Sequence, residues 1–73
     1  MSGVTAVAER NLTPRETDVL KGIVAGLKYA EIGAALGIAY DTVKTVTNRL
    51  RAKTGQSNKA QLIVWAMKNG VTP

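Results

Sequence analysis

The residues best suited to bind another molecule lie between Asp41 and Arg51, where several side chains can hydrogen-bond to nucleic acids. A helix over residues 40–53, with about 100° between successive residues, has one polar outer face. That face carries Asp41, Lys44, Thr45, Asn48 and Ala52, with Arg49 and Arg51 on its flanks. Lys44 can donate to guanine or to a phosphate, Asn48 can pair with adenine, and Thr45 offers a hydroxyl and a methyl group. Arg49 and Arg51 are better placed for phosphates. The pattern predicts a helix that reads the major groove of DNA.

The distribution of charge favours the same half of the chain. Up to Asp41 there are four basic and five acidic side chains, whereas after Asp41 there are six basic and no acidic ones. A polyanion would therefore bind the second half. A basic surface and a polar helix face are also typical of a protein that is simply soluble, but solubility does not explain the one-sided charge.

Asp41 is the exception on the outer face, because an acid repels phosphates. Two interpretations stay open. Asp41 can stabilise the positive N-terminal end of its helix, or it can accept a hydrogen bond from a cytosine amino group. The first is favoured.

The segment that positions this face has the spacing of a helix-turn-helix. Ile32 and Leu36 lie one helical turn apart, and Gly33 leaves room for a close helix crossing. Gly37 supplies the positive φ that ends the first helix, and Ile38 fills the corner. Apolar residues then recur at three- and four-residue intervals along the second helix, at Val43, Val46 and Leu50. One apolar face per helix leaves the far side of the second helix free for DNA.

Two further helices complete an all-α prediction. The first follows a capping box of Thr13 and Glu16 with Pro14 between them, and Gly26 ends it. The helix-turn-helix is expected over residues 28–36 and 40–53. The last helix is expected over residues 58–69, with Ser57 as its cap and Gly70 as its stop.

The last helix is apolar on more than one side. Leu62, Ile63 and Ala66 form one stripe, and Ala60, Val64 and Met67 form another, with Trp65 between them. Packing on a single core needs only one stripe. We therefore predict a dimer interface at Ala60, Val64, Trp65 and Met67. The alternative is that Val64 and Met67 are scattered surface residues, which are common.

The composition limits the other classes of function. The chain has no Cys and no His, so a zinc finger is excluded, and we expect no metal, no cofactor and no enzymatic activity. No apolar run is long enough to span a membrane, and no signal peptide is recognisable. The expectation is a soluble, cytoplasmic protein with a flexible tail over residues 1–11 and one domain over 12–71.

Taken together, these residues resemble the LuxR/FixJ-type DNA-binding domain, also called GerE-like. The similar stretches are Leu12-Thr13-Pro14-Arg15-Glu16, Val19-Leu20, Gly26-Leu27, Glu31-Ile32, Leu36-Gly37-Ile38, Thr42-Val43-Lys44, and Lys53 with Gly55. The resemblance implies a four-helix domain, unrelated to winged-helix folds, whose third helix enters the major groove. Its fourth helix would pair two copies on an inverted repeat. By position, Lys44, Thr45 and Asn48 correspond to base contacts, and Thr42 and Lys59 to backbone contacts.

The chain departs from the family pattern at several positions. Ala39 replaces the usual serine before the recognition helix, and Lys28 occupies another polar cap position. Val46 replaces a common histidine, and Thr54 a leucine. Family members usually carry a receiver or ligand-binding domain ahead of this module, but eleven residues precede Leu12, so we expect a stand-alone module. It resembles either a compact regulator or an isolated output domain.

Two functional hypotheses remain. The first is a sequence-specific, dimeric DNA-binding regulator, in which Lys28 and Tyr29 also reach a phosphate strand; their alternative is a plain surface lysine and a half-buried tyrosine. The second is a protein-interaction module that pairs with a full-length relative or binds RNA polymerase, with DNA contact secondary.

Overall fold

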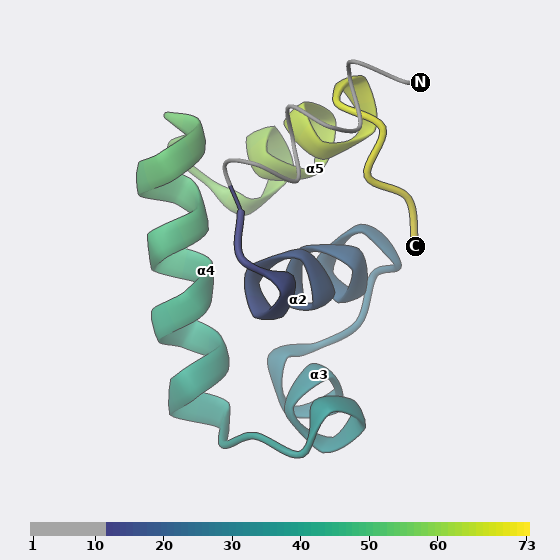
Figure 1. Ribbon diagram of the computed structural model, residues 1–73, viewed down its shortest axis with the longest axis vertical. Helices are drawn as coiled ribbons and strands as arrows, with labels where there is room; N and C mark the ends of the chain where they lie inside the picture. Colours follow the sequence, from purple (N-terminus) through teal and green to yellow (C-terminus); the bar gives the residue numbers. More distant parts are fainter. Residues whose placement is uncertain (1–11) are drawn as a thin grey trace.

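The computed structural model describes residues 12–73, which form four α-helices and no β-strand (Figure 1). In chain order the helices are α2 (Pro14–Val24), α3 (Tyr29–Leu36), α4 (Tyr40–Thr54) and α5 (Lys59–Lys68). The all-α, four-helix prediction is confirmed. The tail predicted over residues 1–11 lies outside the described residues. None of the described helices is both long and apolar enough to cross a membrane.

α2 begins with the reciprocal hydrogen bonds that its sequence predicts. The hydroxyl of Thr13 accepts the N–H of Glu16 at 3.1 Å, and Glu16 Oε1 accepts the N–H of Thr13 at 2.9 Å. These two bonds satisfy backbone donors that the first turn of a helix leaves free. Pro14 occupies the first turn, where its missing N–H costs nothing. The capping box therefore fixes where α2 starts.

α2 lies at the centre of the domain and packs against each of the other three helices (Figure 1). Its buried side chains, Val19, Leu20 and Ile23, are completely enclosed. The rest of the core comes from Leu12, Ile32, Val43, Val46, Leu50, Leu62, Ala66 and Val71. One shared core therefore holds α4 against α2 and α3, and this packing decides which face of α4 is exposed.

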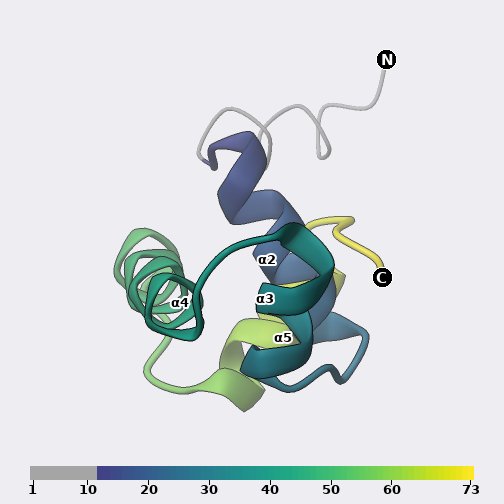
Figure 2. The same ribbon diagram turned by 90° about the horizontal axis from the view of Figure 1, so that it is seen from below.

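The turn between α3 and α4 has the predicted geometry. Gly37 has a φ of 70°, in the left-handed region that glycine adopts without strain, and ends α3. The N–H of Ile38 donates to the carbonyl of Gly33 at 2.9 Å, and the Ile38 side chain packs on the core. Figure 2 shows the chain crossing from α3 to the start of α4 through this short connection.

The chain packs against Gly33 more closely than the sequence indicates, and a larger residue would not fit there. A Cβ on Gly33 would lie 2.7 Å from the backbone oxygen of Ile38 and 3.6 Å from a methyl of Val43. The tightest neighbour is therefore the turn itself, with α4 next to it. Gly22 of α2, which sequence analysis does not single out, has a comparable contact with the side chain of Ile32, at 2.8 Å.

These two glycines give a matched stability prediction. Gly33→Ala should lower the free energy of unfolding by about 1–3 kcal/mol, because the added methyl forces apart a turn whose backbone is already hydrogen-bonded. Gly22→Ala should cost less, since its close contact is with a side chain, that of the buried Ile32, whereas Gly33→Ala meets the Ile38 carbonyl, which is fixed in the chain. Urea denaturation of both variants measures the difference. An equal or smaller loss for Gly33→Ala would contradict the turn contact.

The start of α5 differs by one residue from the prediction. The predicted cap was Ser57, but the N-cap is Asn58, whose side-chain oxygen accepts the N–H of Gln61 at 2.9 Å. The Ser57 N–H instead donates to the Gln61 side chain at 2.9 Å. Both residue types cap helices well, so composition alone does not decide between neighbours. At the other end Gly70 has a φ of 79°, in agreement with its predicted role as the stop.

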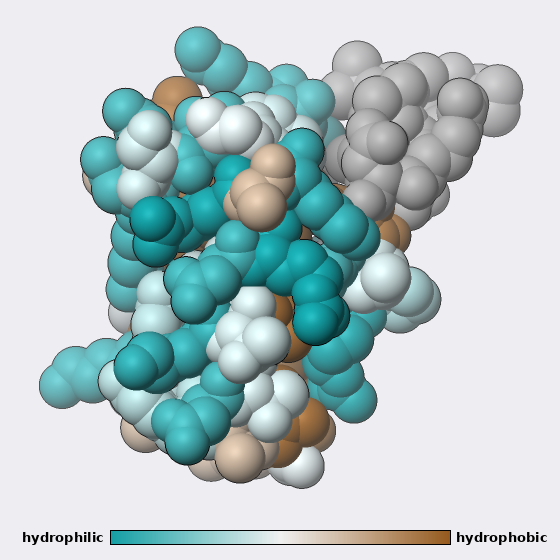
Figure 3. All heavy atoms as spheres, turned by 90° about the vertical axis from the view of Figure 1, so that its left-hand side faces the viewer, coloured by the Kyte–Doolittle hydropathy of each residue, from teal (hydrophilic) through white to brown (hydrophobic). Residues whose placement is uncertain are grey.

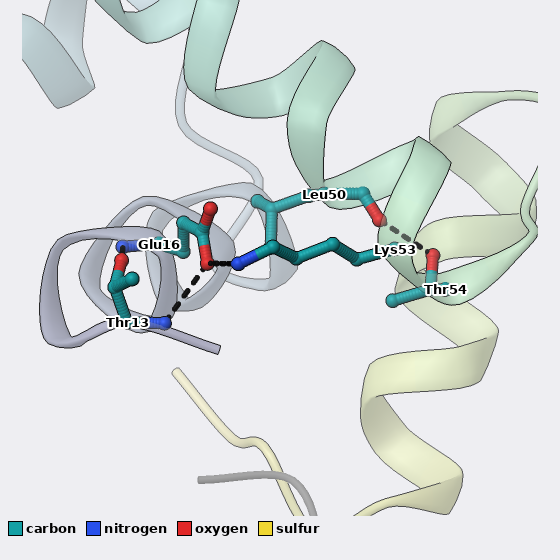
Figure 4. Close-up of polar contacts among 5 residues, drawn as sticks. All are labelled: Thr13, Glu16, Leu50, Lys53 and Thr54. Carbon is teal, nitrogen blue, oxygen red and sulfur yellow. Dashed lines mark hydrogen bonds and ion pairs between the residues drawn. The ribbon is translucent and has the colours of Figure 1, made fainter. Parts of the chain in front are cut away.

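An ion pair between an exposed lysine and a buried carboxylate joins the start of α2 to the end of α4 (Figure 4). Lys53 Nζ donates to Glu16 Oε1 at 2.8 Å, and the Glu16 side chain is 1% exposed. Burial alone raises the pKa of Glu16. The hydrogen bonds from Lys53 and Thr13, with the charge of Lys53, outweigh burial and hold that pKa below its usual value. Sequence analysis assigned Glu16 to capping alone, so its second partner is new.

Candidate nucleic-acid interface

The outward face of α4 is mostly polar (Figure 3). Val43, Val46, Thr47 and Leu50 are buried against the core. The residues expected on the outer face, Asp41, Lys44, Thr45, Asn48 and Ala52, are all exposed. Of the two flanking arginines, Arg49 is exposed and Arg51 is half-buried, and Thr42 is exposed as well. Apart from Ala52, α4 thus presents a row of side chains that can form hydrogen bonds, on a helix of 15 residues. An α-helix with its side chains is about 10–12 Å across and therefore fits the major groove of B-DNA, which is about 12 Å wide.

Three of the four threonines of α4 use their hydroxyls within the helix. Thr45 donates to the Asp41 carbonyl at 3.0 Å, and Thr47 donates to the Val43 carbonyl at 2.8 Å. Thr54 donates to the Leu50 carbonyl at 2.8 Å. Such bonds to the preceding turn satisfy a hydroxyl that otherwise lacks a partner. For Thr47, which is buried, the bond removes the cost of enclosing a polar group. For Thr45, which is exposed, it fixes which part of the side chain faces outward.

The two arginines of α4 have different surroundings. Arg49 is exposed, as expected for a residue that contacts phosphate. Arg51 is half-buried, and its Nε is enclosed without a hydrogen-bond partner among residues 12–73. It lines a shallow depression with Asn48, Ala52, Gly55 and Gln56. Arg49 therefore remains the better candidate for a direct phosphate contact.

Two tyrosines and three lysines meet where α3, α4 and α5 begin. The rings of Tyr29 and Tyr40 lie 6.2 Å apart, centre to centre. Lys59 Nζ lies 5.4 Å from the Tyr29 ring, and Lys44 Nζ lies 5.8 Å from the Tyr40 ring. Lys28 lines a surface depression together with Tyr29, Tyr40 and Lys59. We call these five residues the tyrosine–lysine patch. Cation–π contacts of this length hold flexible lysines near the rings.

The tyrosine–lysine patch gathers four residues that the sequence nominated separately. Lys28, Tyr29, Lys44 and Lys59 come from three elements, so their proximity depends on the tertiary fold. Sequence analysis missed Tyr40, which is 51% exposed and opens α4. The sequence feature that could have identified Tyr40 is a large aromatic side chain at the first position of the predicted recognition helix.

The backbone N–H groups at helix starts add positive potential to the patch, which the carboxylates of Glu31 and Asp41 in the first turns of α3 and α4 partly offset. α3 and α4 begin after Lys28 and Ala39, and neither N-cap side chain accepts a backbone N–H. The first backbone N–H groups of a helix lack partners inside it, and the helix dipole is positive there. At α3 the Glu31 carboxylate accepts the N–H of Lys28 at 2.7 Å, which satisfies one of them. An anion such as a DNA phosphate would be favoured beside the others.

α5 carries the apolar surface that the sequence predicts for a partner. Leu62 and Ala66 are buried, Ile63 and Trp65 are half-buried, and Ala60 is exposed. The exposed fractions of Val64 and Met67 are 51% and 65%. An open groove is lined by Gln56, Ala60, Gln61, Val64, Trp65 and Lys68. The two predicted stripes thus face in different directions, one into the core and one outward.

Comparison with known families identifies the domain. The sequence profile described as "Bacterial regulatory proteins, luxR family" matches residues 10–66. The chain belongs to the luxR family. This assignment confirms the resemblance to the LuxR/FixJ-type domain.

Its luxR-family relatives are transcriptional regulators. The transcriptional regulatory protein MctR of Rhizobium johnstonii is 43% identical over 60 residues, which are 82% of this chain and 28% of MctR. The probable transcriptional regulator ycf29 of Cyanophora paradoxa is 39% identical over 84% of this chain and 29% of ycf29. The transcriptional regulatory protein LiaR of Bacillus subtilis is 37% identical over 93% of this chain and 32% of LiaR. The chain therefore spans less than a third of the length of these relatives. No solved structure gave a significant match.

The departures from the luxR-family pattern have small structural effects. Ala39 leaves α4 without a side-chain cap, as expected, and Thr54 replaces a leucine but satisfies its hydroxyl within the helix. Val46 is 5% exposed and belongs to the core. None of these changes alters the exposed face of α4.

Proposed function

We propose that this luxR-family domain binds double-stranded DNA in a sequence-specific manner and regulates transcription, with α4 in the major groove. The observation that carries the proposal is the two-sided character of α4. Its inner face is fixed in the core, and its outer face exposes Lys44, Thr45 and Asn48 for base edges. A rigid helix with this pattern meets the geometric requirement for direct readout.

The phosphate contacts would lie on either side of the base contacts. Four residues of the tyrosine–lysine patch, with Thr42 beside them, would face the backbone at the N-terminal end of α4, whereas the fifth, Lys44, is assigned to the bases. Arg49 would contact the backbone farther along. Of the six cations after Asp41, Lys53 is engaged by Glu16 and Lys68 lines the α5 groove, which leaves Lys44, Arg49, Arg51 and Lys59 for DNA. Neutralising phosphates releases counterions, and binding should therefore weaken steeply as salt rises.

The operator is proposed to be an inverted repeat bound by a homodimer. Val64 and Met67 leave an apolar strip on α5 that the monomer does not cover. A twofold axis would place the same strip of a second copy against it. Two copies of α4 then read two half-sites, and DNA binding would take place in the cytoplasm for a bacterial regulator.

Selection of bound sequences from a random DNA pool tests the proposal. We expect an enriched motif with twofold symmetry, and we expect the affinity for that motif to exceed the affinity for shuffled DNA by about 10³-fold or more. Titrations at several salt concentrations should show weaker binding to both duplexes as salt rises. If no motif is enriched, while the protein still binds DNA weakly and uniformly, the sequence-specific proposal is wrong.

The α5 groove also supports the second candidate, a module that pairs with a longer luxR-family regulator. The same apolar strip could accept the corresponding helix of such a relative. Mixing the domain with a full-length relative and following complex size distinguishes the two functions. A stable mixed complex, together with a random-pool selection that enriches no DNA motif, would favour the interaction module.

A further inference from the structure

The N-terminal half of the exposed α4 face offers hydrogen-bond acceptors to a DNA base. The Thr45 hydroxyl donates its single hydrogen to the Asp41 carbonyl at 3.0 Å. What remains outward is an oxygen lone pair and a methyl group, because a hydroxyl has one hydrogen and two lone pairs. Thr45 thus cannot donate to a base without breaking a bond within its own helix.

Asp41 lies one turn before Thr45 and has only acceptor atoms to offer. Its side chain is exposed, and the only ion pair formed within residues 12–73 joins Lys53 to Glu16. Lys44 is near in sequence, but its ammonium lies over the Tyr40 ring. The Asp41 carboxylate is therefore not neutralised by a neighbour in the described part of the chain. An ionised carboxylate accepts hydrogen bonds and cannot donate them.

We propose that Asp41 and Thr45 act as an acceptor pair that selects bases with an exocyclic amino group, with cytosine N4 as the partner of Asp41. This inference rests on the proposed DNA-binding function and adds the class of base that is read. In the major groove, cytosine and adenine present amino donors, whereas guanine and thymine present acceptors. A carboxylate facing guanine O6 or thymine O4 would be repelled, so Asp41 discriminates by excluding the wrong bases as well as by binding cytosine.

The competing role for Asp41 is stabilisation of the α4 N-terminus. Asp41 lies in the first turn of a helix whose N-cap, Ala39, has no side-chain acceptor, so its charge favours the helix dipole. That role predicts an effect on stability and on general affinity for DNA. It predicts no change in preference at any one base pair. The two roles therefore differ in a measurable way.

Random-pool selection with matched variants tests the inference. Asp41→Asn keeps the size of the side chain but removes its charge and adds donors. Asp18→Asn makes the same change at an exposed acid of α2, away from the α4 face. The wild type should select cytosine at one position of each half-site. Asp41→Asn should reduce that preference about 5- to 100-fold and leave the other positions unchanged, and Asp18→Asn should leave the motif intact.

A second pair of variants separates the oxygen of Thr45 from its methyl group. Thr45→Val keeps the methyl group and loses the acceptor, and Thr45→Ser does the opposite. Thr45→Val should relax selection for an amino-bearing base at the adjacent position, whereas Thr45→Ser should retain it. Thermal unfolding of every variant shows that the fold is kept.

Three results would overturn the inference in different ways. If Asp41→Asn keeps the wild-type motif and binds all DNA more tightly by a uniform factor, Asp41 only repels phosphates and selects no base. If the wild type itself enriches no motif, the proposed function fails and the inference fails with it. An intact motif that lacks cytosine opposite α4 would refute the inference alone.

Discussion

Replacing Val64 and Met67 together by Glu should convert a dimer into monomers and weaken binding to a two-half-site operator by about 10²- to 10⁴-fold. The loss has this size because a dimer holds its second α4 near the second half-site at a high effective concentration, and a monomer does not. Both side chains are more than half exposed, so the substitutions should leave the core intact. Analytical ultracentrifugation measures the mass, and DNA titration measures the affinity.

Two controls separate the apolar contact from charge. Val64→Gln with Met67→Gln removes the apolar strip without adding negative charge, and it should also give monomers. Ala25→Glu with Thr72→Glu adds the same charge at exposed positions outside the α5 groove, and this variant should stay dimeric. A parent protein that is already monomeric, both free and on DNA, would disprove the α5 interface.

Breaking the ion pair between Lys53 and Glu16 should cost about 1–3 kcal/mol of folding free energy. Lys53→Met keeps the aliphatic stem but leaves the Glu16 carboxylate enclosed, with Oε2 already lacking a partner among residues 12–73. This loss of folding free energy is smaller than that for breaking a fully buried ion pair, because the Lys53 side chain is 36% exposed and water screens the pair. Urea denaturation of Lys53→Met, Glu16→Gln and the double variant measures the loss. The double variant should be less damaged than the sum of the single changes.

The same pair predicts a pH dependence with a definite sign. The folded-state pKa of Glu16 lies below its usual value, so the folded protein holds the carboxylate ionised more readily than the unfolded chain does. Its contribution is therefore complete above the ordinary carboxyl range and is lost as pH falls through the lowered pKa. The stability gap between wild type and Glu16→Gln should narrow as the solution is acidified. A gap that stays constant from neutral to strongly acidic pH would contradict the assignment.

Local signals predict most of this fold. Thr13, Pro14 and Glu16 determine the start of α2, and Gly37 determines the turn, because caps and positive-φ glycines act over three or four residues. The apolar spacing of Val43, Val46 and Leu50 determines the buried face of α4, and hence the exposed one. The predicted cap of α5 was wrong by one residue. Ser57 and Asn58 are both suitable caps, and which of them caps the helix depends on the path of the chain that leads into α5.

Contacts between distant residues could not be predicted from local patterns. Lys53 is 37 positions from Glu16, and only the packing of α4 on α2 brings them together. The tyrosine–lysine patch likewise joins three helix starts, so Tyr40 had no recognisable partner in the sequence. The direction of the Thr45 hydroxyl is a further property that only the structure supplies.

The most direct test of the account is the operator discrimination of Asn48→Ala and Lys44→Ala, measured by competition between the selected operator and a shuffled duplex. Each variant should lose about 1–3 kcal/mol of discrimination and keep its unfolding temperature, because both side chains are exposed on the outer face of α4. Lys21→Ala, at an exposed lysine of α2, should retain full discrimination. Unchanged discrimination in both α4 variants would show that another surface reads the DNA.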